Sequence, residues 1–200
     1  MLDTAIESAR AAESGVSDMV LENDILQSGD CSRLDFERMR FTKCRFTDCN
    51  FTGAGFYDTV FENCLFSGCR FENSYFRDST FSFCKGDGSI FRQSVFRGLK
   101  AENSSFCYGD FAEAMWDGCI VRDCEMRDAF MSECKLKKAE FNGVNFTHTD
   151  FFGTMLKGQD LSDCIIDGIM VSEHFSELKG LKVNAMQAAD LACMLGIKIV

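Results

Sequence analysis

Twelve cysteines and two histidines are the residues of this 200-residue chain best suited to catalysis or metal binding. A metal site needs ligands that converge on one point, and a nucleophile needs a base within hydrogen-bond reach. His148 and His174 have no nucleophile and carboxylate at a motif spacing, so we expect two surface histidines. The segment Gly86-Asp87-Gly88 lacks the length and the lysine of a phosphate-binding loop, and we expect a local bulge there. The sequence therefore predicts no catalytic residue, no metal and no cofactor.

The cysteines follow a regular spacing. Nine of the twelve occupy one position of a five-residue repeat: Cys44, Cys49, Cys64, Cys69, Cys84, Cys119, Cys124, Cys134 and Cys164. Members separated by multiples of 20 residues would form a column, in which neighbours could reach disulfide distance but could not converge around a metal. The chain does not open with a basic segment followed by an apolar one, so we expect no secretory signal and reduced thiols in the cytoplasm. We interpret each thiol as the filling of a small buried slot.

A large apolar residue stands at every fifth position from Leu21 to Val171, which we term the centre; the exceptions are Cys31, Gly86 and Ala101. Phenylalanine holds ten consecutive centres from Phe36 to Phe81. We expect the last nine to form a buried ladder: Phe41, Phe46, Phe51, Phe56, Phe61, Phe66, Phe71, Phe76 and Phe81. Turn-forming residues recur two positions after the centre: Asp48, Gly53, Asp58, Asn63, Gly68, Asn73 and Asp78. A period of five fits neither a helix nor a strand, and it predicts a chain that coils.

Residues 21–175 resemble the pentapeptide-repeat family, whose motif is a small residue, any residue, leucine or phenylalanine, and two polar residues. The resemblance implies an all-β solenoid, a right-handed quadrilateral β-helix in which four pentapeptides make one coil. About seven to eight coils are expected, stacked at the strand spacing of about 4.8 Å. The two ends of such a solenoid are open edges that need caps.

Residues 1–20 are expected to form an N-terminal cap segment over the first coil. Leu2, Ile6 and Ala9 stand at helical spacing, and Gly15 is the predicted stop of a short helix. The alternative is a disordered leader.

The tail, residues 176–200, is expected to hold a helix between an N-cap at Asn184 and a stop at Gly196. It is similar to the C-terminal tail of the Qnr-type quinolone-resistance members of the family at Lys182, Gln187, Ala188 and Leu195-Gly196-Ile197. In those members the tail joins two rods end to end. The similarity implies a homodimer formed through the apolar residues Met186, Leu191, Met194, Leu195, Ile197 and Ile199. The alternative is the end cap of a monomer.

The formal net charge of −10 argues against direct binding of nucleic acid or of an anionic membrane, because both attract lysine and arginine. No apolar run approaches the roughly 18 residues of a membrane span. Three faces of the predicted coil are acidic. The second half of one carries carboxylates without a basic residue in the same pentapeptides, and we term it the acidic half-face: Asp110, Glu113, Glu133, Asp150 and Glu173. The remaining face carries a basic patch at Lys135, Lys137 and Lys138.

The Qnr-type members are proposed to resemble DNA and to bind type II topoisomerases at the DNA site. The resemblance therefore implies a non-enzymatic DNA mimic that binds DNA gyrase or topoisomerase IV through the acidic half-face and modulates fluoroquinolone sensitivity. Some members that protect gyrase carry two loops that interrupt the repeat. The unbroken frame here leaves no room for such loops, so the resemblance supports binding more than protection against the drug. The alternative is a pentapeptide-repeat scaffold for protein–protein interaction with an unrelated partner.

Overall fold

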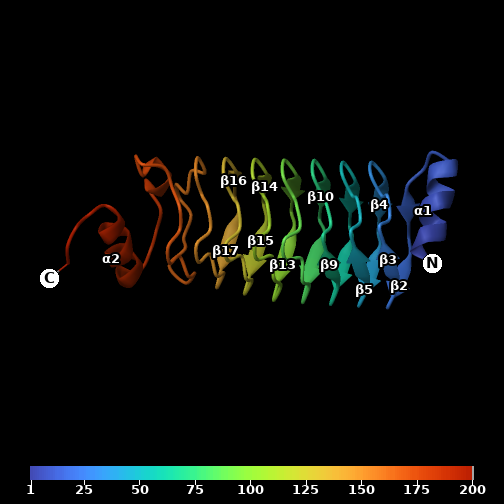
Figure 1. The fold of residues 1–200 in the computed structure, drawn as a ribbon, viewed down its shortest axis with the longest axis horizontal. Helices are drawn as coiled ribbons and strands as arrows, with labels where there is room; N and C mark the ends of the chain where they lie inside the picture. Colours follow the sequence, from blue (N-terminus) through green and yellow to red (C-terminus); the bar gives the residue numbers. More distant parts are fainter. Residues whose placement is uncertain (200) are drawn as a thin grey trace.

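Each pentapeptide forms one side of a four-sided coil, and successive coils pair in parallel with a shift of 20 residues, as Phe41 does with Phe61. The structure is a computed structural model that describes residues 1–199. It is an elongated rod of stacked coils with a short helix at each end (Figure 1). This confirms the predicted right-handed quadrilateral β-helix.

Three faces of the rod contain strands. The first face is a sheet of seven strands: β1 (Val16–Ser17), β4 (Asp35–Glu37), β7 (Gly55–Tyr57), β10 (Tyr75–Arg77), β12 (Val95–Arg97), β14 (Met115–Asp117) and β16 (Lys135–Lys137). The second face also has seven: β2 (Val20–Glu22), β5 (Arg40–Thr42), β8 (Val60–Glu62), β11 (Thr80–Ser82), β13 (Lys100–Glu102), β15 (Ile120–Arg122) and β17 (Glu140–Asn142). The third face begins with β3 (Ile25–Gln27), β6 (Arg45–Thr47) and β9 (Leu65–Ser67). Isolated parallel bridges, such as Asp30 with Asn50, connect the coils on the fourth face.

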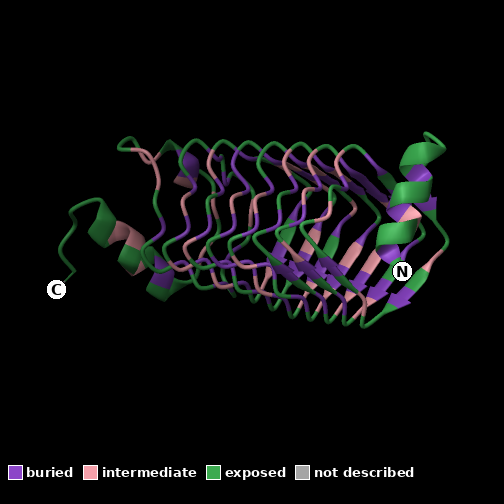
Figure 2. Cartoon of the chain, turned by 45° about the vertical axis from the view of Figure 1, so that its right-hand side comes forward, coloured by how far each residue is buried: buried purple, intermediate pink, exposed green. Residues whose placement is uncertain are grey.

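The phenylalanine ladder fills the interior, as predicted. All nine rings are at most 3% exposed. Phe71 lies nearly parallel to Phe51 and to Phe91, with ring centroids 4.8 and 4.7 Å apart. The stacking distance equals the strand spacing, so the backbone ladder itself sets the ring contacts. Figure 2 shows buried and exposed residues alternating around every coil.

The corners of the coils lie at the predicted turn residues. All seven have a positive φ, from 50° at Asp58 to 70° at Gly53. Glycine, asparagine and aspartate reach this left-handed region at low cost, which explains their recurrence two residues after the centre.

The small residue two positions before the centre does more than fill space. Its side chain donates a hydrogen bond to the carbonyl oxygen of the centre 23 residues earlier. Cys64 Sγ lies 3.3 Å from the Phe41 oxygen, and Ser74 Oγ lies 2.8 Å from the Phe51 oxygen. Cysteine, serine and threonine recur here because they are small and carry a donor. All twelve cysteines are free thiols, and eleven are buried.

The expected bulge at Gly86-Asp87-Gly88 is wrong. The ladder runs through this segment, with the Gly86 and Gly88 N–H groups bonded to carbonyls of the next coil at 2.8 Å. A Cβ at Gly86 would stand 2.9 Å from the ring of Phe106. Gly86 therefore makes room for that ring, which turns edge-on to Phe81 and Phe91.

The N-terminal end is covered by α1 (Leu2–Ala11), which confirms the expected helix. It buries three side chains: Leu2, Ile6 and Ala9. The helix ends ahead of Gly15, and Glu13, with φ of 50°, begins the turn into the coil. The first strand starts at Val16, five residues before the centre at Leu21.

The C-terminal end holds a 3₁₀ turn, η1 (Ser176–Leu178), and the helix α2 (Ala185–Met194). Asn184 and Gln187 form a reciprocal capping box, which confirms the predicted N-cap. Gly196, with φ of 79°, follows the helix as predicted. Its N–H donates to Cys193 O, and the Ile197 N–H donates to Ala192 O, the pattern of a glycine-terminated helix.

Candidate protein-interaction surfaces

The acidic half-face is assembled by the fourth face of the rod. Parallel bridges place Asp110 and Asp150 in one column, on either side of Phe130. Glu113 and Glu133 occupy the adjoining corner, both with left-handed φ angles. Glu173 follows in the last coil and is exposed. Four of the five predicted carboxylates, Asp110, Glu113, Glu133 and Asp150, thus share one side of the rod.

Several of these carboxylates already have partners. Arg92 donates to Asp110 from Nη2 at 2.9 Å and lies 3.8 Å from Glu113. Gln93 Nε2 also donates to Glu113, at 2.8 Å. The acidic half-face was defined by the absence of basic residues from its own pentapeptides, but the preceding coil brings Arg92 against it. The two ends of the acidic half-face therefore differ in charge. Arg92 compensates the negative charge of Asp110 at one end. Among residues 1–199, no basic residue lies within 4.0 Å of Glu133.

Exposed apolar side chains interrupt the acidic half-face, and the sequence analysis missed them. Phe130, Phe152 and Met170 are 48%, 52% and 50% exposed. Phe130 and Met170 lie on either side of Asp150 in one column, and the Phe152 N–H donates to Asp150 Oδ1 at 2.8 Å. The sequence did carry a signal for these three exposed side chains, because each residue stands directly before or after a centre and must therefore point outward. A mixed surface of this kind is typical of a protein interface.

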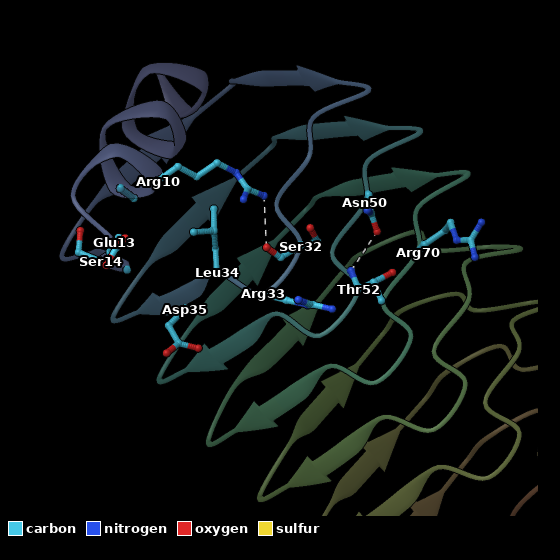
Figure 3. A pocket seen from close by; sticks show the side chains of 12 residues that line it. Arg10, Glu13, Ser14, Ser32, Arg33, Leu34, Asp35, Asn50, Thr52 and Arg70 are labelled. Carbon is cyan, nitrogen blue, oxygen red and sulfur yellow. Dashed lines mark hydrogen bonds between the residues drawn. The ribbon is translucent and has the colours of Figure 1, made fainter.

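A second concave surface lies between α1 and the fourth face at the N-terminal end (Figure 3). The hollow has a volume of about 950 Å³. Arg10 reaches across it from α1, and its Nη2 donates to the carbonyl oxygens of Asp30 and Ser32 at 2.9 and 3.2 Å. No histidine or cysteine lines it. Arg10 therefore fastens α1 to the first coil. The described residues that line the hollow do not include a nucleophile paired with a base.

The tail forms the third candidate surface. Five of its six predicted interface residues are exposed: Met186, Met194, Leu195, Ile197 and Ile199. Leu191 differs, because it packs partly buried against the core of its own chain. Gln187 is buried and closes the rod, with Nε2 donating to the carbonyls of Leu161 and Cys164 at 2.9 and 2.7 Å. The tail is thus docked by its first turn and leaves an apolar side uncovered.

Glu177, a further residue that the sequence analysis missed, organises the last coil. It is 1% exposed and accepts hydrogen bonds from the Gly153 N–H at 2.9 Å and the Ser172 hydroxyl at 2.8 Å. Burial alone would raise its pKa, but these bonds together with that of the Ser172 N–H outweigh burial and hold the pKa of Glu177 at about 2. Asp160 pairs with Lys182, a shift of 22 residues, so the last coil is longer than the others.

Among residues 1–199, neither histidine lies in a catalytic group of side chains, and no metal-binding cluster is present. His148 lies at a corner with φ of 57°, and its Nδ1 is 3.5 Å from Asp128. His174 is exposed. No three histidine, cysteine or acidic side chains of the described part are grouped to hold a metal ion. No described helix has the length and apolarity needed to cross a membrane.

Comparison with solved structures finds other pentapeptide-repeat proteins. A trypsin-treated variant of QnrB1, a plasmid-mediated fluoroquinolone resistance protein, is 21% identical over 91% of this chain and 92% of its own, with a TM-score of 0.43. A pentapeptide-repeat protein of the Arabidopsis thaliana thylakoid lumen is 16% identical over 49% of this chain and 67% of its own, with a TM-score of 0.46. HetL of the cyanobacterium Nostoc, involved in heterocyst differentiation regulation, is 12% identical over 88% and 92%, with a TM-score of 0.36. No curated protein matches the sequence at a significant level.

Family models give the more direct comparison. The model described as "Pentapeptide repeat region" matches residues 34–111, and the one described as "Pentapeptide repeats (8 copies)" matches residues 131–168. Both matched segments wind in the same five-residue frame of one continuous stack of coils. The chain belongs to the pentapeptide-repeat family.

Proposed function

We propose that this protein is a non-enzymatic, dimeric interaction rod that binds a type II topoisomerase, DNA gyrase or topoisomerase IV, as a DNA mimic. The observation that carries the proposal is the tail. The residues that make it similar to the Qnr-type tail have structural roles here: Gln187 closes the last coil, and Gly196 ends α2. The exposed apolar side that remains is suited to pairing with a second copy.

The acidic half-face supports the DNA-like part of the proposal. A rigid column of carboxylates produces a field of the same sign as that of DNA phosphates, and it would attract the basic DNA-binding surface of a topoisomerase. Such a partner places the protein in the cytoplasm, where its buried thiols stay reduced. The absence of interrupting loops supports binding rather than drug protection.

A second candidate is a scaffold for an unrelated partner. Phe130, Phe152 and Met170 favour it, because a DNA duplex presents no comparable apolar side chains along its phosphate edge. Arg92 also favours it, since it reduces the negative charge near Asp110.

The two candidates are separated by titrating the purified protein into a gyrase supercoiling assay, with and without ciprofloxacin. Topoisomerase binding predicts inhibition of supercoiling, or relief of the drug's effect, at micromolar protein. Neutralising the acidic half-face in one variant (Asp110→Asn, Glu113→Gln, Glu133→Gln, Asp150→Asn) should abolish either effect. The asparagine substitutions keep the side-chain oxygens that Ala112 and Phe152 N–H groups use.

The matched control removes four carboxylates from the first two faces: Glu22→Gln, Glu37→Gln, Glu62→Gln and Glu102→Gln. It changes the net charge equally and should keep full activity. Equal loss in both variants would indicate that total charge matters and that the acidic half-face has no special role. No effect of the unmodified protein in either arm would support the scaffold.

A further inference from the structure

Within residues 1–199 the backbone ladder is interrupted between the coil of β16 and β17 and the coil that follows it. Both seven-stranded sheets end, at β16 and β17, although the chain continues to coil beyond them (Figure 1). In the preceding coil the Lys135 N–H donates to Ala114 O, and the Gly118 N–H donates to Lys137 O, each at 2.9 Å. Among residues 1–199, the equivalent bonds from Met155 to Cys134 and from Lys138 to Lys157 are missing.

The interruption covers two of the four faces. On the second face the equivalent bonds beyond β17 are also missing within residues 1–199, and Asp160 pairs instead with Lys182 of the last coil. On the third and fourth faces the same two coils stay joined by bridges from Asn145 to Ile165 and from Asp150 to Met170. The result is a seam in the hydrogen-bond ladder of the first two faces, and β16 has no ladder partner on this side within the described chain. The two coils stay in contact just before β16, where the Cys134 N–H donates to Thr154 Oγ1 at 2.7 Å.

The seam exposes part of the core. Leu136 is the one centre between Leu21 and Ile166 that is not fully buried in the described chain. A groove of about 630 Å³ runs beside it, lined by Glu133, Cys134, Lys135, Leu136, Phe152, Gly153 and Met155. Phe152 and Met155 are each about half exposed, at 52% and 51%. A Cβ at Gly153 would stand 3.2 Å from Glu133 Cγ, so glycine avoids crowding at this wall of the groove.

Lysines lie along the first-face part of the seam, whereas its second-face part carries the carboxylates of Glu140 and Asp160. Lys135 and Lys137 lie on the β16 side of the seam, and Lys157 stands 20 residues after Lys137, in the next coil. Lys137 pairs with Asp117 at 3.3 Å. Lys135, Lys138 and Lys157 are exposed and have no acidic partner within 4.0 Å among residues 1–199. Glu133 is the one acidic residue among the described residues that line the groove.

We propose that the seam is a docking site for an extended acidic segment of a partner protein. The free edge of β16 offers backbone groups for strand pairing, and extended segments bind open edges in this way. Alternate apolar side chains of the segment would cover Leu136, Phe152 and Met155. The carboxylates between them would meet Lys135, Lys138 and Lys157. Strand pairing and charge together select an acidic β-strand over a basic one.

The inference does not depend on a topoisomerase, and its test uses the full chain alone. A fluorescein-labelled decapeptide of alternating glutamate and valine is titrated with the protein, and anisotropy gives the Kd. We expect saturable binding, weakened about tenfold or more by Lys135→Glu with Lys138→Glu. The control Lys43→Glu with Lys100→Glu reverses two exposed lysines where the ladder is intact, and it should bind like the unmodified protein.

Two further probes test the strand pairing itself. A peptide of the same charge with proline at alternate positions cannot pair and should bind at least about tenfold more weakly. Amide hydrogen exchange of Leu136 and Lys138 should slow when the glutamate–valine peptide binds. Equal binding of the proline peptide, unchanged exchange at these amides, or unchanged affinity in the Lys135 and Lys138 variant would each overturn the proposal. Circular dichroism melting establishes that the variants fold.

Discussion

Each inward-facing phenylalanine is held by the rings of the coils on either side. Phe71 is fully buried between Phe51 and Phe91, so its removal leaves a cavity that the stacked coils cannot close. Phe71→Ala should lower the free energy of unfolding by about 3 to 5 kcal/mol, measured by chemical denaturation. Phe83→Ala is the matched control, because Phe83 is 59% exposed and its loss should cost less than about 0.5 kcal/mol. Equal stability of the two variants would contradict the inward placement of Phe71.

The thiols differ sharply in accessibility. Eleven cysteines are buried and Cys193 is exposed. Burial raises the pKa of Cys119 to about 11 and that of Cys134 to about 12, so neither forms a thiolate at neutral pH. At pH 8 we expect at most one thiol of the folded chain to react with a disulfide reagent, and none in a Cys193→Ser variant. Rapid reaction of several thiols without denaturant would contradict the packing.

At the scale of the element, the last coil depends on Glu177. The folded-state pKa of Glu177 is about 2, below its ordinary value of 4.5, so its stabilisation is complete above pH 4.5. This contribution is lost as the pH falls from about 4.5 towards 2. Glu177→Gln should destabilise the protein by about 1 to 3 kcal/mol at pH 7, and by less at pH 3.

Denaturation of the Glu177 variant at the two pH values measures this difference. Glu173→Gln is the control, because Glu173 is exposed and its substitution should leave the stability unchanged at both. A deficit that is the same at pH 7 and pH 3 would refute the role of the Glu177 carboxylate.

The five-residue frame predicted the repeated elements because every coil obeys the same local rule. With few exceptions, the centre and the small residue are buried and the turn residue forms a corner. The buried ladder and the corners could therefore be predicted from the residue type at each position of the repeat. Contacts between coils join residues about 20 apart and escape such a rule, which is why the pairing of Arg92 with Asp110, 18 residues later, was missed. The seam and the longer last coil do coincide with departures from the motif. Gln159 stands at a small-residue position in the coil across the seam, and Ser176 stands where the centre after Val171 would be.

For the whole molecule, the tail is the proposed dimer interface. Met186 and Ile197 are 77% and 54% exposed, so changing them to glutamate should not disturb the fold of one chain. Met186→Glu with Ile197→Glu should convert a dimer into monomers in sedimentation velocity. Leu191 is a poorer choice, because it also packs against its own core. A persistent dimer in this variant, or a monomeric unmodified protein, would contradict the proposed interface.

Competition with DNA for gyrase tests the proposed mimicry most directly. Gyrase is loaded with a fluorescent linear DNA, and the protein is added while the anisotropy of the DNA is followed. The proposal predicts displacement of the DNA, with an apparent affinity that falls in proportion to the DNA concentration and is lost on neutralising the acidic half-face. A ternary complex in which the DNA stays bound, or no binding of the protein to gyrase, would contradict it.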